Sequence, residues 1–331
     1  MEDKVQDEVV LTVEDLHVKI QTPEGVVHAV RGVDLSLSKG KVLGLVGESG
    51  SGKTMTCMSL LRLLPRAADI TSGSIRMGNT DLLELTEAEM RKKRGRDLSM
   101  IPQNPMTALN PAFTIGQQFI ETLRTHQKMS RKEAHQLAVD SLLEMGMAHP
   151  ERVMKQFPHE LSGGMLQRVM TAIAIATQPV VLIADEPTTA IDAVNQHQVL
   201  EHLRDLSNRH ELSIVFVSHD WGAVTQVADE VAVMYRGFIV ERAPLATLLE
   251  HAMHPYTHAL LEARLRLVRR KHQIVTSIAE PASTVLGSPA QCPFLESCPL
   301  AETLCGERVP ELTEYEENHW VRCHVAGKRA G

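Results

Sequence analysis

The octapeptide GESGSGKT at residues 47–54 constrains the fold more than any other stretch of this chain. It follows KVLGLV, a short apolar run typical of a strand buried on both faces, and it precedes KTMTCMSLLRLL, which has helical character. A glycine-rich turn between a strand and a helix lets backbone N–H groups wrap a phosphate chain. The predicted nucleotide-binding residues are therefore Gly47, Glu48, Ser49, Gly50, Ser51, Gly52, Lys53 and Thr54. Lys53 would neutralise the β- and γ-phosphates, and the Thr54 hydroxyl would bind Mg²⁺.

A second apolar run, VVLIADE at 180–186, ends in two consecutive acids. Two carboxylates at the edge of a core are costly to bury together without a cation. Mg²⁺ prefers hard oxygen ligands and shares them with phosphates. We therefore assign Asp185 to the magnesium shell and Glu186 to orienting and activating the attacking water, with a solvated strand end as the weaker alternative.

Strands alternate with helices along most of the chain, which indicates an α/β fold around a parallel sheet. Two N-terminal stretches alternate like antiparallel strands, and a hairpin is expected to turn at Arg236–Gly237. The segment after residue 108 has helical periodicity without strand signals and is interpreted as a helical insertion. The predicted organisation is a phosphate-loop NTPase domain over 8–250, with a helical subdomain at about 108–170, and a small extension over 251–331.

The net charge of −7 gives no global basic field, so nucleic acid is not the expected partner. No apolar run approaches the ~18 residues that span a bilayer. The acidic start, MEDKVQDEVV, lacks the pattern of a signal peptide. The chain is therefore expected on the cytoplasmic side, and any membrane role would need other subunits.

Four of the five cysteines crowd into the C-terminal extension, at Cys292, Cys298, Cys305 and Cys323. In a reducing compartment such a cluster indicates a metal site before disulfides. The gaps of five, six and seventeen residues are not the short C-x₂-C spacing of common structural zinc sites. Four thiolates could hold a 4Fe-4S cluster or a tetrahedral zinc, and buried thiols without metal are the alternative.

Five ordered motifs resemble those of ATP-binding-cassette ATPases: GESGSGKT, the glutamine of MIPQNP, LSGGMLQR, VVLIADEPTTAID and VSHD. The resemblance covers about 9–250. It implies that Gln103 reaches the magnesium or the attacking water, and that His219 contacts the γ-phosphate. The implied cofactors are ATP and Mg²⁺.

The same resemblance implies that two cassettes pair head to tail. Each chain would complete the nucleotide site of its partner, so that hydrolysis depends on dimer closure. The residues lent to the partner would be Ser162, Gly163, Gly164, Gln167 and Asp192. Ser162 is also the expected N-cap of the helix that begins there.

QNPMTALNP, HPYTHALLEARL and the cysteine-bearing tail resemble the ATPase subunits of dipeptide, oligopeptide and nickel importers. This branch implies two transmembrane permeases, an extracytoplasmic substrate-binding protein, and a second ATPase subunit that is identical or different. It places the chain peripherally at the membrane and favours an iron–sulfur cluster at the cysteines. Peptide is the expected cargo, with nickel, a metal chelate or an opine as alternatives. The spacing of His251, His254 and His258 leaves a nickel or zinc site as an alternative, but they are interpreted as part of a packing element, because Pro255 disrupts the helix that would align them.

Two other classes of protein fit the residues less well. A soluble cassette ATPase of DNA repair or ribosome function usually has long coiled coils between the motifs or two cassettes in one chain. A small-molecule kinase or GTPase shares only the phosphate loop. The turn before the second strand lacks the aromatic that usually stacks on adenine, and Ile20, Val27 or His28 could serve instead.

Overall fold

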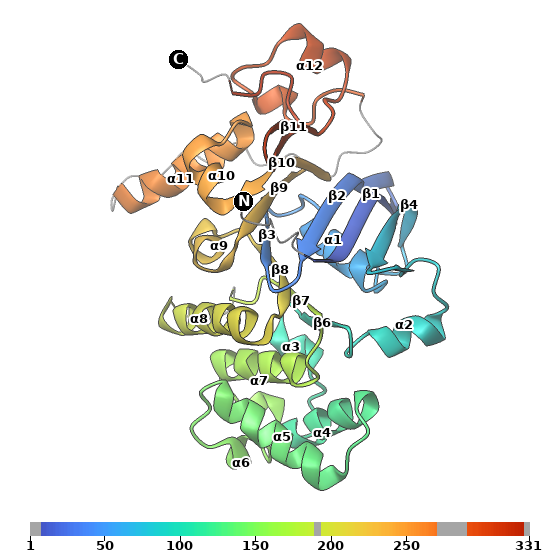
Figure 1. Cartoon of the computed structure of the whole chain (residues 1–331), viewed down its shortest axis with the longest axis vertical. Helices are drawn as coiled ribbons and strands as arrows, with labels where there is room; N and C mark the ends of the chain where they lie inside the picture. The colour runs from blue at the N-terminus through green and yellow to red at the C-terminus, as the bar shows by residue number, and fades with distance from the viewer. Residues whose placement is uncertain (1–7, 189–192, 270–289, 328–331) are drawn as a thin grey trace, which may run out of the picture. The chain divides into compact units, whose positions relative to one another are not determined.

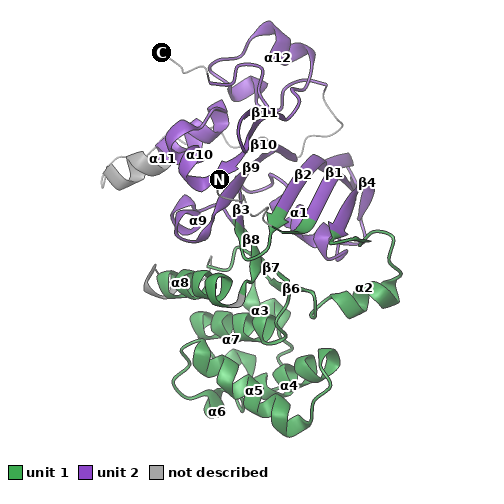
Figure 2. Ribbon diagram, in the orientation of Figure 1, with its two compact units in different colours: residues 1–11, 37–42, 77–217 green, residues 12–36, 43–76, 218–331 purple. Residues whose placement is uncertain are grey.

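The computed structural model describes residues 8–188, 193–269 and 290–327 (Figure 1). The chain divides into two compact units, each assembled from stretches that are distant in sequence (Figure 2). Unit 1 comprises residues 1–11, 37–42 and 77–217, and unit 2 comprises 12–36, 43–76 and 218–331. Among the described residues, no helix is long and apolar enough to cross a membrane.

Unit 1 contains three parallel strands, in the order β8-β7-β6. They are β6 (Leu98–Ile101), β7 (Val181–Asp185) and β8 (Ser213–Ser218). Every residue of β7 and β8 is buried, as expected for parallel strands covered on both faces. The register pairs Asp185 with Val217, so the acid lies at the carboxyl end of this sheet.

The predicted helical insertion is confirmed between β6 and β7. It contains α3 (Pro105–Ala108), α4 (Ile115–His126), α5 (Arg131–Glu144), α6 (Pro150–Val153) and α7 (Gly163–Ala176). Thr114 and Ser130 begin α4 and α5 with reciprocal capping boxes. Helix α4 buries Ile115, Phe119 and Leu123, which recur every four residues on one face. The rest of unit 1 includes β5 (Thr80–Asp81), α2 (Glu87–Lys93), a 3-10 turn (Pro158–Glu160) and α8 (Ala193–His210).

Unit 2 contains a sheet in the order β2-β1-β4, made of β1 (Val9–Thr22), β2 (Gly25–Ser38) and β4 (Ala68–Met77). Its second sheet has the order β11-β12-β10-β9-β3. These strands are β3 (Val42–Val46), β9 (Glu230–Tyr235), β10 (Phe238–Pro244), β11 (Thr313–Glu316) and β12 (His319–Val321). Strand β9 pairs in parallel with β3 and antiparallel with β10, which in turn pairs antiparallel with β12.

The predicted hairpin is confirmed, since β9 and β10 turn at Arg236 and Gly237, both with positive φ. The C-terminal tail adds two short strands beyond β10, where the sequence pattern was weak. The helices of unit 2 are α1 (Lys53–Leu60), α9 (Trp221–Val227), α10 (Leu245–His251), α11 (Pro255–Arg269) and α12 (Thr303–Glu307), with a 3-10 turn at Leu295–Ser297.

Candidate functional site

The phosphate loop lies between the end of β3 and the start of α1, in unit 2. A Cβ at Gly47 would lie 2.2 Å from the carbonyl oxygen of Met234, so a side chain does not fit there. Gly52 has φ 108°, and a Cβ there would lie 2.4 Å from the carbonyl oxygen of Ala29. Gly52 is also the N-cap of α1 and has no side chain with which to cap that helix. The glycines therefore bring the backbone close to its neighbours and leave a helix N-terminus suited to an anion.

Lys53 is almost fully buried inside this loop, with 5% of its side chain exposed. Its Nζ donates hydrogen bonds to the carbonyl oxygens of Gly47 at 2.7 Å and Glu48 at 2.8 Å, and to Oγ of Ser51 at 3.4 Å. The ammonium is thus held at the centre of the loop. Phosphate oxygens are stronger acceptors of a charged donor than these carbonyls, which suits Lys53 to the role predicted for it.

Two distant segments of unit 2 hold the loop from outside. The N–H of Gly237, in the β9–β10 turn, donates to the carbonyl of Ser51 at 2.8 Å. The N–H of Glu48 donates to the hydroxyl oxygen of Tyr256 at 3.2 Å. Tyr256 was not predicted from the sequence, because its motif was interpreted only as a packing element. The sequence has only three tyrosines, and the hydroxyl of a buried tyrosine usually has a hydrogen-bond partner. This is the signal from which a polar contact of Tyr256 could have been predicted.

Unit 1 brings Gln103 and Glu186 together. Nε2 of Gln103 donates to Oε2 of Glu186 at 3.0 Å. Glu186 has φ 47°, a left-handed conformation that non-glycine residues rarely adopt, and its N–H donates to the carbonyl of Val217 at 2.9 Å. The amide orients one carboxylate oxygen of Glu186, and the predicted role of Glu186 as the base stays a prediction.

The structure tests whether magnesium suits the acid that ends β7. Asp185 is 1% exposed and follows four buried apolar residues, so its charge requires compensation, and its oxygens are ligands that Mg²⁺ accepts. The predicted magnesium set of Thr54, Gln103 and Asp185 joins residues of both units, and it stays a prediction. His219 is exposed directly after β8, and its predicted contact with the γ-phosphate also stays a prediction.

The LSGG turn precedes α7. Oγ of Ser162 accepts the N–H of Met165 at 3.4 Å, which confirms its expected role as an N-cap. Ser162 and Gly163 are exposed, whereas Gln167 is 3% exposed within α7. Asp192 lies outside the described residues. The predicted contacts of this turn with a partner's nucleotide stay a prediction.

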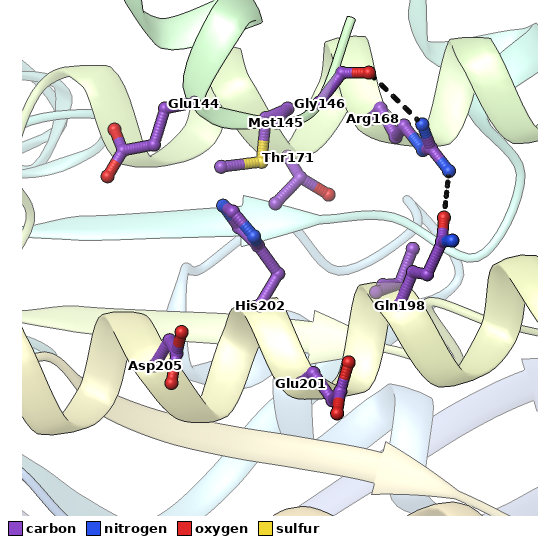
Figure 3. Close-up of a pocket in the computed structure, with 10 residues that line it drawn as sticks. Glu144, Met145, Gly146, Arg168, Thr171, Gln198, Glu201, His202 and Asp205 are labelled. Carbon is purple, nitrogen blue, oxygen red and sulfur yellow. Dashed lines mark hydrogen bonds between the residues drawn. The ribbon is translucent and has the colours of Figure 1, made fainter.

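A cavity of about 470 Å³ opens elsewhere in unit 1, between the end of α5, α7 and α8 (Figure 3). Arg168 spans it, donating to the carbonyl of Gly146 at 3.5 Å and to Oε1 of Gln198 at 2.5 Å. The cavity is lined by Glu144, Met145, Gly146, Arg168, Thr171, Gln198, Val199, Glu201, His202 and Asp205. This lining contains none of the predicted phosphate-binding residues, so the cavity is separate from the candidate site.

The four C-terminal cysteines do not form the expected metal site in this structure. Within the described ranges, no three or more His, Cys, Asp or Glu side chains are grouped so that they could hold a metal ion. Burial is the main cause that raises the pKa of Cys323 to about 12, and the charges of the other three thiols contribute to this rise. Burial likewise raises the pKa of Cys292 and of Cys298. The arrangement of the described residues therefore does not support the expected iron–sulfur or zinc site.

Known proteins resemble this chain over most of its length. Residues 30–189 match the ABC transporter family, and residues 240–305 match the C-terminal region of oligopeptide/dipeptide transporters. The dipeptide transport ATP-binding protein DppD of Bacillus subtilis is 42% identical over 98% of this chain and 96% of its own. The oligopeptide transport ATP-binding protein AppD of the same organism is 43% identical over 90% of each chain. The probable D,D-dipeptide transport ATP-binding protein DdpD of Escherichia coli is 41% identical over 95% of each.

Among solved structures, the chain resembles an ATP-binding cassette determined as a dimer in a post-hydrolysis state with ADP and Pi. The TM-score is 0.65 at 24% identity, over 71% of this chain and 98% of that one. This likeness confirms the predicted fold class. The relatives that match nearly the full length show that the chain belongs to the ATP-hydrolysing ABC transporter family, in the group of dipeptide and oligopeptide transport ATP-binding proteins.

Proposed function

We propose that the chain is the energy-coupling ATPase subunit of a peptide importer. The observation that carries this proposal is sequence similarity to DppD over 98% of the chain. The C-terminal region, which matches that of oligopeptide/dipeptide transporters, is included in this similarity. The phosphate-loop geometry and the contact between Gln103 and Glu186 supply the parts that ATP hydrolysis requires.

Within one chain, the loop N–H groups, Lys53 and the N-terminus of α1 bind and orient the triphosphate. Glu186, oriented by Gln103, accepts the proton of the attacking water. Thr54, Gln103 and Asp185 would hold magnesium, which when bound neutralises charge on the β- and γ-phosphates. His219 completes the set as a contact to the γ-phosphate.

The partners in this proposal are a second ABC ATPase, identical or different, two transmembrane permeases, and indirectly an extracytoplasmic substrate-binding protein. Ser162, Gly163, Gly164, Gln167 and Asp192 would contact the nucleotide held by the other ATPase. The exposure of Ser162 at the start of α7 supports this arrangement. The chain would act at the cytoplasmic face of the membrane, bound to the permeases.

Transport by the assembled complex tests the proposal. The chain is purified with its permeases, reconstituted into vesicles, and supplied with binding protein and a labelled dipeptide. ATP-dependent uptake of the dipeptide is expected. Uptake of nickel, a metal chelate or an opine in place of peptide would overturn the peptide assignment, and failure to assemble with any permease would overturn the importer.

Glu186→Gln tests the chemistry in the same complex. Removing a general base is expected to lower hydrolysis by about 10²- to 10⁴-fold, while ATP binding persists. Glu201→Gln, which lines the separate cavity, is the matched control and should leave turnover unchanged. Turnover of Glu186→Gln at the wild-type rate would remove Glu186 from its role.

We also propose that Cys292, Cys298, Cys305 and Cys323 bind a 4Fe-4S cluster. What supports this is that each of the other three thiols raises the pKa of Cys323 through its charge, so the four lie near one another. The thiols would have to turn from their present arrangement to share one metal. Iron and acid-labile sulfide in the anaerobically purified brown chain are expected; a colourless, iron-free chain, or zinc alone, would refute the cluster.

A further inference from the structure

The contact between Tyr256 and the phosphate loop links the C-terminal region to the nucleotide site of the same chain. Tyr256 is fully buried, at 0% exposure, at the start of α11. Its hydroxyl accepts the N–H of Glu48, the second residue of the loop, at 3.2 Å. Burial raises the pKa of Tyr256, so the hydroxyl stays neutral and can serve as an acceptor over the whole physiological range.

An aromatic cluster fixes the Tyr256 ring. The centroid of Tyr256 lies 4.5 Å from that of Tyr235, which ends β9. Phe294 packs on both, with centroids 5.3 Å from Tyr235 and 5.5 Å from Tyr256. All three rings are at most 5% exposed, and such ring pairs each add to the stability of the arrangement beyond the area they bury.

A buried carboxylate fixes the backbone that carries Tyr256. Glu241 of β10 is 0% exposed and accepts the N–H of Met253 at 2.6 Å and that of His254 at 3.1 Å. The same carboxylate lies 2.8 Å from Nε2 of His319 in β12. Nδ1 of His254 accepts the N–H of Tyr256 at 3.0 Å. The turn that positions Tyr256 is therefore tied to both β10 and the C-terminal strand.

The cysteine-bearing segment reaches this cluster through Phe294, two residues after Cys292. Nη1 of Arg236, in the β9–β10 turn, donates to the carbonyl of Pro293 at 3.4 Å and so holds the segment in place. The neighbouring N–H of Cys292 donates to the carbonyl of Cys305 at 2.8 Å. A change in the cysteine segment would thus act on Phe294, then on Tyr256, and then on the loop.

We propose that Tyr256 is a positioning residue for the phosphate loop, and that through Phe294 and Tyr256 the cysteine-bearing segment sets the affinity of this loop for the triphosphate. The inference rests on nucleotide binding by the loop but not on the identity of the cargo. The loop grips phosphate with backbone N–H groups, whose directions depend on the loop conformation. Holding the Glu48 peptide in place lowers the ordering cost of binding, so loss of that hold should weaken binding and leave the chemical step intact.

Tyr256→Phe in the full-length chain is the central test, since it keeps the ring and removes only the acceptor. Binding of adenylyl imidodiphosphate with Mg²⁺, measured by calorimetry, is expected to weaken about three- to tenfold, the scale of one lost hydrogen bond. In the assembled transporter, KM for ATP should rise by a similar factor while kcat at saturating ATP stays the same. Unchanged affinity, or a fall in kcat with unchanged KM, would overturn the proposal.

Tyr235→Phe is the matched control, because it removes from the same cluster a hydroxyl that hydrogen-bonds Ser297 and interacts with Glu48 only through charge. Its analogue affinity should equal that of the wild type. Phe294→Leu should also weaken binding of the analogue, as Tyr256→Phe does. Wild-type affinity in Phe294→Leu would contradict the proposed effect of the cysteine-bearing segment on the loop. Thermal unfolding without nucleotide shows whether each variant is folded. Lys53→Ala tests nucleotide binding itself, so its result is separable from that of Tyr256→Phe.

Discussion

At the scale of single residues, burial decides the chemistry of the turn that carries Tyr256. His254 is 1% exposed, and burial lowers the pKa of its ring to about 4. The nearby charge of Glu241 opposes this shift, and that of His258 adds to it. The ring therefore remains neutral at physiological pH, which leaves Nδ1 free to accept the N–H of Tyr256.

This lowered pKa predicts a loss of stability in acid. The unfolded chain takes up the proton near pH 6.5, whereas the folded chain takes it up only near pH 4. The unfolded state thus binds more protons in between, and the free energy of unfolding falls as the pH falls through that window. The shift corresponds to about 3 kcal/mol by pH 4.

His254→Asn isolates this contribution, since its side-chain oxygen can accept the same N–H but does not titrate. Urea unfolding from pH 7 to pH 4 should show a shallower decline for the variant than for the wild type. Parallel declines would mean that His254 does not take part in the acid response.

At the scale of elements, the helices and buried strands of unit 1 could be predicted from local sequence patterns. The continuous apolar runs predicted β7 and β8, because parallel strands covered on both faces carry no alternation. The turn at Arg236–Gly237 was predictable from its residues alone. Glu186 was predicted from the two acids that end an apolar run, whereas Gln103 was predicted only from resemblance to a family. Their contact could not be predicted from spacing, since 83 positions separate them.

The C-terminal strands could not be predicted in the same way. Every residue of β11 is exposed, and β12 has only three residues, so neither shows a hydrophobic pattern of useful length. What holds β12 is its pairing with β10 and the buried contact of His319 with Glu241, 78 positions earlier. Contacts of that range leave little trace in local sequence. The burial of Cys292, Cys305 and Cys323 is likewise a product of tertiary packing.

At the scale of the whole molecule, we propose that a second ATPase would complete the site. Ser162 lies at an exposed helix start, so a side chain there can reach a partner without disturbing the core of its own chain. Ser162→Asp keeps an N-cap of equal quality but places a negative charge where a phosphate is expected.

This substitution should leave ATP binding by the isolated chain unchanged. In the assembled transporter, hydrolysis should be lost if two identical chains pair, and should fall to roughly half if a different ATPase is the partner and its two sites turn over independently. Ser130→Asp, which changes the corresponding cap of α5, is the control. Full hydrolysis by Ser162→Asp in the transporter would contradict a site shared between subunits.

The bond between Glu48 and Tyr256 also has a consequence for biosynthesis. The ribosome makes the phosphate loop early, but about two hundred more residues must emerge before the residue that secures it exists. At ordinary rates of protein synthesis this interval is roughly 10 to 40 s. A nascent or prematurely terminated polypeptide that lacks Tyr256 would therefore be expected to bind ATP more weakly than the finished chain.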